Sequence, residues 1–224
     1  MTKTALPAML RGDRLGSQAI RNSIGAGGVV ACSLLDAVGE EWFGVAAVRG
    51  VDGSEVLERL GVDPSVSVAR YRIDEATEHL GWSSSAIRLY EQPGADWVYL
   101  FDASPQEGVV FRESVLVRLS SGCEVVAAWA LVNSTTRLAH ARDGQVVARC
   151  DAWSYEPASG IAPQRLNAAL EQVGFFPSES EEEEERPSSA ALALEALEQG
   201  FGLAVDAEAV RGPLPTVVVP ATAG

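Results

Sequence analysis

The stretch V-V-A-A-W-A-L-V-N-S-T-T-R-L-A-H-A-R-D-G-Q-V-V-A-R-C, residues 125–150, decides the fold class. It begins with Val125–Val132, the most apolar run in the chain, and an unbroken run of this length indicates an interior strand covered on both faces. Thr136–Arg142 and Gln145–Cys150 then flank Asp143-Gly144, a pattern typical of two antiparallel strands joined by a type I′ turn. Together, the three segments predict an antiparallel sheet.

The turn also predicts which side chains share a face of this hairpin. Counting outward from Arg142 opposite Gln145 places Arg137 opposite Cys150, on a face of small apolar residues. The same count places His140 on the opposite, solvent-exposed face. Because an unpaired guanidinium on the core side costs several kcal/mol, Arg137 needs either a carboxylate partner or a bound anion. The second alternative predicts a ligand-binding site at Asn133 and Arg137.

The remaining segments extend the sheet and add helices. Strand patterns occur at Trp42–Val48, Ala86–Tyr90 and Trp97–Phe101, and Leu214–Val219 fits a last short strand. Helical periodicity occurs in six further segments: Val29–Val38, 54–60, Ile73–Leu80, Phe111–Ser121, 163–173 and Ser189–Gln199. We therefore predict an α+β fold with a mostly antiparallel sheet of about five strands and helices packed on at least one face.

Composition shifts divide the chain into four parts. Residues 1–28 end in G-A-G-G and predict a flexible N-terminal segment, which residues 29–176 follow as the α+β core domain. Residues 177–188 contain six glutamates, and a like-charge block of this kind predicts an acidic disordered linker. Residues 189–224 predict a C-terminal helix and short strand that pack back on the core.

The charge balance restricts the partners. The formal net charge is -14, and it is still about -8 when the six linker glutamates are left out. A chain this acidic is repelled by nucleic acid and by anionic lipid, so we expect neither as a partner. No apolar run reaches the ~18 residues that a membrane helix needs. Three cysteines without a secretory signal predict reduced thiols and a cytoplasmic location.

The inventory of reactive residues argues against an enzyme. The single lysine, Lys3, has a context that fits neither a Schiff base nor a phosphate loop. The two histidines and three cysteines show no metal-site spacing, so we predict no metal and no cofactor. No serine, cysteine or carboxylate is linked by a motif to His140, and we expect it to be a surface histidine.

The leading functional hypothesis is a non-enzymatic, acidic protein-interaction module of the regulatory or toxin-neutralising (immunity-like) kind. Acidic surfaces steer association with basic partners, so we expect a partner with a basic surface. The predicted partner-binding residues are Trp82 and Trp153, beside turn residues, with Glu181, Glu182 and Glu183 of the acidic segment. The alternative is a small-molecule or anion-binding domain around Arg137, a class that includes degenerate enzymes.

Several stretches between residues 40 and 220 resemble, by their order and spacing, a family of actinobacterial proteins described only as a domain of unknown function. These are W-F-G-V-A-A-V-R-G with S-E-V-L-E-R-L-G, D-W-V-Y-L-F, V-N-S-T-T-R-L-A-H-A-R-D-G-Q-V-V, and A-L-A-L-E-A-L with L-P-T-V-V-V-P. The resemblance implies a cytoplasmic bacterial α+β protein. It implies no activity and no functional residues.

Overall fold

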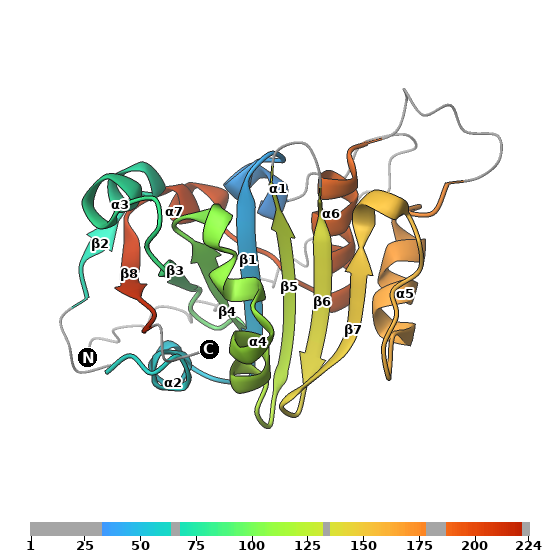
Figure 1. Ribbon diagram of the computed structural model, residues 1–224, viewed down its shortest axis with the longest axis horizontal. Helices are drawn as coiled ribbons and strands as arrows, with labels where there is room; N and C mark the ends of the chain where they lie inside the picture. The colour runs from blue at the N-terminus through green and yellow to red at the C-terminus, as the bar shows by residue number, and fades with distance from the viewer. Residues whose placement is uncertain (1–32, 64–67, 132–134, 178–186, 221–224) are drawn as a thin grey trace, which may run out of the picture. The chain divides into compact units, whose positions relative to one another are not determined.

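The computed structural model describes residues 33–63, 68–131, 135–177 and 187–220 of the 224-residue chain (Figure 1). The strands are β1 Phe43–Arg49, β2 Arg70–Tyr71, β3 Ala86–Glu91, β4 Trp97–Asp102, β5 Glu124–Ala130, β6 Arg137–Arg142, β7 Gln145–Asp151 and β8 Leu214–Val218. The α-helices are α1 Ser33–Val38, α2 Gly53–Arg59, α3 Ile73–Leu80, α4 Glu113–Leu119, α5 Gln164–Gln172, α6 Ser189–Phe201 and α7 Ala207–Arg211. Short 3-10 turns form η1 Pro105–Glu107, η2 Val109–Phe111 and η3 Ala152–Ser154.

The described strands form one sheet in the order β2-β8-β3-β4-β1-β5-β6-β7, and every pairing is antiparallel. β5 pairs with β1 on one side and with β6 on the other, and all but one of its residues are buried. The apolar run at its centre therefore belongs to an interior strand, as the sequence predicts. The α+β class is confirmed.

Helices cover both faces of the sheet, which explains why the interior strands are apolar throughout (Figure 1). In β1, Phe43, Val45 and Ala47 belong to one hydrophobic cluster, with residues of α1, α5, α6 and α7. Ala46 and Val48 point to the opposite face and belong to a second cluster, with residues of η2, α2 and α4. Alternate side chains of one strand thus enter two separate cores.

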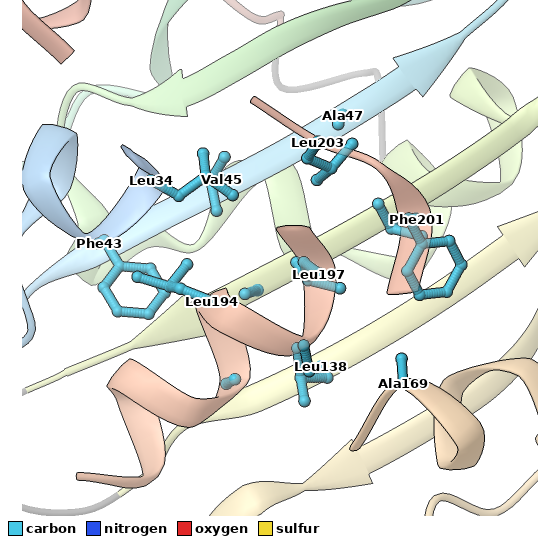
Figure 2. Packing of buried hydrophobic residues seen from close by; sticks show 14 of the residues in the cluster. Leu34, Phe43, Val45, Ala47, Leu138, Ala169, Leu194, Leu197, Phe201 and Leu203 are labelled. Carbon is cyan, nitrogen blue, oxygen red and sulfur yellow. The ribbon is translucent and has the colours of Figure 1, made fainter. Parts of the chain in front are cut away.

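The first core is built mainly by α6 lying across the sheet (Figure 2). Leu194, Leu197 and Phe201 recur at helical spacing and are nearly inaccessible to solvent. On another side of α6, Gly200 approaches α5 so closely that an added Cβ would lie 2.2 Å from the Cβ of Ala169. The small residues at this crossing allow α6 to contact the sheet and α5 together.

The prediction of about five strands is wrong, because the sheet has eight. That estimate came from strands joined by short turns in the middle of the chain. β8 comes from the C-terminal end of the chain and pairs between β2 and β3. β2 contains two residues, too few to show an alternating pattern. The sequence cannot reveal such pairing, because it depends on contacts between distant segments.

The hairpin turn is confirmed, but the predicted register is wrong beyond its first two pairs. Asp143 and Gly144 have positive φ values of 52° and 76°, as a type I′ turn requires. A β-bulge between His140 and Ala141 then adds Val147 to β7, so that His140 pairs with Ala148. The bulge shifts β7 by one residue, and Arg137 pairs with Asp151 instead of Cys150.

The predicted solvent-exposed position of His140 is wrong for a different reason, because α6 packs over that face of β6. His140 is 5 % exposed, and its ring lies edge-on to Phe201 with ring centroids 5.2 Å apart. The face that the sequence predicts to be wet is covered by α6. A polar side chain in a hairpin says little about exposure when a helix from elsewhere in the chain packs over it.

Two of the predicted parts fall largely outside the described residues, namely the N-terminal segment 1–28 and residues 178–186 of the acidic segment. The predicted helix over Phe111–Ser121 begins as the 3-10 turn η2 and continues as α4. In the C-terminal part, α6 contacts α5 and β8 joins the sheet beside β3.

Candidate functional site

Three large apolar side chains are exposed near the end of β4. Trp42, just before β1, is 40 % exposed, and Ile73, at the start of α3, is 44 % exposed. Both line one cavity, together with Pro105. Trp82 is 62 % exposed, and its carbonyl accepts a hydrogen bond from the hydroxyl of Ser104, the residue before Pro105. We call Trp42, Ile73 and Trp82 the apolar patch.

Acidic side chains accompany the apolar patch on the same segments. Glu40 and Glu41 immediately precede Trp42, and both are exposed. Asp74 and Glu78 are exposed on α3, the helix that begins with Ile73. An apolar centre with carboxylates on the adjoining segments is complementary to a partner surface that carries apolar and basic groups.

The predicted partner-binding tryptophans lie far apart. Trp153, in η3 after β7, is 60 % exposed. Trp82 precedes β3, and β3 and β7 are five strand steps apart in the sheet. At ~4.8 Å per step, roughly 24 Å of sheet separates them. Both side chains are exposed, but they belong to different surfaces. Glu181, Glu182 and Glu183 lie outside the described residues, so their partner-binding role stays a prediction.

Arg137 lines a cavity of about 270 Å³ in which three guanidinium groups meet two aromatic rings. Arg112 lies just before α4, Arg137 begins β6, and Arg149 comes from β7. The Cζ atom of Arg137 lies 5.7 Å from the ring centroid of Trp129, within the range of a cation–π contact. Phe111 stacks on the same indole, with centroids 6.4 Å apart.

The aromatic wall of the Arg137 cavity is held in place by backbone contacts. The indole Nε1 of Trp129 donates a hydrogen bond of 2.6 Å to the carbonyl of Pro105. Gly108 has φ 54°, and an added Cβ would lie 3.2 Å from the same nitrogen. Glycine is therefore favoured at position 108 for two reasons: the backbone is left-handed, and the indole lies close to it.

Each arginine of this cavity already has a carboxylate partner. Arg137 lies 3.0 Å from Asp151, Arg149 lies 2.8 Å from Glu113, and Arg112 lies 3.1 Å from Glu107. All six side chains are at least a third exposed. Exposed pairs contribute only about 0–1 kcal/mol each, so an anionic ligand can replace a carboxylate partner at low cost.

Arg137 therefore has the predicted carboxylate partner and also lines a cavity, and anion binding there stays a prediction. The other predicted residue of this site, Asn133, lies outside the described residues. The sequence did not predict Arg112, Arg149 or Trp129 as its neighbours, because they come together only through the sheet and the packing of α4.

A second charged cluster, which sequence reasoning missed, surrounds Glu124 at the start of β5. Glu124 accepts a 3.0 Å hydrogen bond from Nε2 of His140 and pairs with Arg165 of α5 and, at 3.7 Å, with Arg49. Burial lowers the pKa of His140, while the contact with Glu124 acts in the opposite direction. The carboxylate is fully engaged and links β1, β5, β6 and α5, whereas the buried Nδ1 of His140 has no hydrogen-bond partner among the described residues.

The described thiols are not activated. Burial raises the pKa of Cys123, and it raises the pKa of Cys150 to about 11. Neither group is a thiolate at neutral pH, so neither is a ready nucleophile. Within the described ranges, no three His, Cys, Asp or Glu side chains are arranged to hold a metal ion. None of the helices there is both long and apolar enough to cross a membrane.

Together, these features define a three-layer α+β protein with an antiparallel sheet, an exposed apolar patch and an arginine-lined cavity. The chain belongs to a family of unknown function, DUF6461, whose family model matches residues 34–210. The matched region runs from the second residue of α1 into α7 and includes both surfaces described above. No curated protein and no solved structure matches the chain significantly.

Proposed function

We propose that this protein is a non-enzymatic interaction module that binds a basic protein partner through the apolar patch. The observation that carries this proposal is the exposure of Trp42, Ile73 and Trp82 around the end of β4. Such a module regulates or neutralises its partner by covering part of the partner's surface. We place this activity in the bacterial cytoplasm, where the thiols of Cys123 and Cys150 stay reduced.

The apolar patch has the composition of an interface centre. Tryptophan is enriched among residues that dominate binding energy, because a large ring leaves water on association. Isolated exposed apolar residues are ordinary, but grouped ones indicate a binding surface. Trp42 and Ile73 border one cavity, and Trp82 adjoins its wall, so the three side chains form such a group.

Charge favours a basic partner over an acidic or neutral one. The patch adjoins the exposed carboxylates Glu40, Glu41, Asp74 and Glu78, and the whole chain carries a net charge of -14. Lysine or arginine side chains of a partner can pair with these carboxylates and lie over the exposed indoles. Rim charges act mainly on the association rate, so we expect binding to weaken as salt increases.

The test compares the native chain with Trp42→Ala/Trp82→Ala on a partner first identified by cross-linking in cells and then purified. Ile161→Ala is the control, because Ile161 is 72 % exposed but lies beyond β7, away from the patch. We expect the double substitution to weaken binding at least ~100-fold, since interface tryptophans each contribute about 2 kcal/mol or more. Equal affinity of the double variant and the control contradicts the proposal.

The Arg137 cavity favours a second candidate function, the binding of a small anion with an aromatic ring. Three guanidinium groups supply the charge, and Trp129 and Phe111 supply a flat wall. Phenyl phosphate is a suitable probe, titrated by calorimetry. Arg137→Gln should weaken its binding about tenfold, whereas Arg142→Gln, at the other end of β6, should leave it unchanged. Equal effects of the two substitutions exclude this candidate.

A further inference from the structure

The cavity bordered by Trp42 and Ile73 of the apolar patch is itself a candidate site for a small molecule. It has a volume of about 120 Å³, and its walls are mostly apolar. Val38, Phe43, Phe101 and Val210 are among the side chains that line it. For comparison, benzene fits in an apolar protein cavity of roughly 150 Å³. The space suits a molecule of about six non-hydrogen atoms.

A buried cation that forms no ion pair with any described residue lines this cavity. Arg88 of β3 is 2 % exposed. Its Nη2 donates to the carbonyls of Val210 and Gly212, at 2.8 and 2.7 Å, and its Nε donates to the carbonyl of Tyr71. None of the hydrogen bonds among the described residues uses Nη1, and no carboxylate there forms an ion pair with Arg88, on which the exposed Asp74 acts only at longer range.

Asp102 also borders this cavity, but its carboxyl group lies on the other face of the sheet from Arg88. Asp102, at the end of β4, is 1 % exposed. Its Oδ1 accepts a 3.1 Å hydrogen bond from the backbone N–H of Val110, and its Oδ2 has no partner. Burial raises the pKa of Asp102 to about 8, so the group is a neutral acid at neutral pH and supplies no counterion to Arg88.

We propose that this cavity binds a short aliphatic monocarboxylate, such as butyrate, from solution. The ligand carboxylate pairs with the guanidinium of Arg88, which has no ion-pair partner among the described residues. The apolar walls contact the alkyl chain. This inference goes beyond the proposed protein interaction, because the ligand is a small molecule and binds the isolated chain.

The chemistry of the cavity discriminates between ligands of the same shape. An amine of equal size would bring a second cation beside Arg88. An alcohol or amide would occupy the cavity but leave the guanidinium without a counterion. Because buried charges are costly unless paired, the carboxylate should bind most tightly.

The test is an NMR titration of the ¹⁵N-labelled full chain with butyrate, butyramide and butylamine. We expect butyrate to shift the amide signals of Val38, Gly44 and Val210, with an affinity at least ~10-fold above that of butyramide. Equal affinity for the three compounds overturns the proposal, as do shifts confined to other regions. The measurement contains no protein partner, so its failure leaves the proposed interaction untouched.

Two substitutions locate the site without removing Arg88, which also anchors backbone carbonyls. Ala37→Phe places a ring on a residue that lines the cavity, and Asp36→Phe places the same ring on the adjacent exposed residue. We expect the first to weaken butyrate binding at least ~10-fold and the second to leave it within about twofold.

Discussion

Asp102 should make the chain less stable as pH rises, and Asp102→Asn should remove that dependence. Folding raises the pKa of this carboxyl from 3.8 to about 8, mainly because burial disfavours the charged form. Between these values the folded chain keeps a proton that the unfolded chain has lost. The free energy of unfolding therefore falls with increasing pH by about 1.4 kcal/mol per unit from this group. Its stabilising effect is full below pH ~4 and is lost as pH rises to ~8.

The magnitude follows from the pH interval. Between about pH 5 and pH 7.5, Asp102 should lower the free energy of unfolding of the native chain by about 3 kcal/mol. The Asp102→Asn chain should show no such decrease from this position. The asparagine amide adds an unpaired buried donor and costs about 1–3 kcal/mol, but this cost does not change with pH. The diagnostic quantity is therefore the slope of the stability difference, and not its value at one pH.

The assay is urea denaturation followed by tryptophan fluorescence, with native and Asp102→Asn chains compared at four pH values in that interval. Subtracting the two curves removes the contributions of all distant titrating groups. We expect the difference to favour Asp102→Asn increasingly as pH rises. Two parallel stability curves would mean that Asp102 is already ionised in the folded chain, and the reasoning from burial would be refuted.

Three further predictions concern stability, each measured by urea denaturation. Gly44→Ala places a Cβ 2.1 Å from Oδ2 of Asp102 and should lower the free energy of unfolding by at least about 2 kcal/mol. In the control Gly53→Ala, the atom nearest to the added Cβ belongs to a flexible glutamate side chain, so the loss should be under ~1 kcal/mol. Glu124→Ala leaves the buried Nε2 of His140 without a partner and should cost about 2–4 kcal/mol; Glu113→Ala, which breaks an exposed pair, should stay within ~1 kcal/mol. Gly144→Ala should cost about 1–2 kcal/mol because φ is 76°, and no loss would argue against the type I′ turn.

The outcome for the hairpin shows how far local sequence signals extend. Asp143-Gly144 determines the turn, because the left-handed backbone at both positions restricts which residues fit. The bulge at His140 has no comparable signal, since Val146 and Val147 fit a strand equally well on either face. A single added residue then reversed the predicted orientation of the outer part of β7.

The candidate sites show the same division. The exposure of Trp82 and Trp153 was predictable, because both tryptophans adjoin turn residues. The grouping of Trp82 with Trp42 and Ile73 was not, because it depends on the adjacent positions of the start of β1, the end of β4 and α3. Similarly, the sequence predicted Arg137 but not its cavity, whose other walls come from η2, β5 and β7.

The sequence alone determined the α+β class, the interior position of β5, the turn and the acidic character of the chain, since each depends on composition or on residues close together. The tertiary structure decided the pairing of β8 with β2 and β3, the burial of His140 and the environment of Asp102. These depend on which distant segments pack together, and burial by a segment far along the chain changes the charge state and partners of a side chain without any local trace.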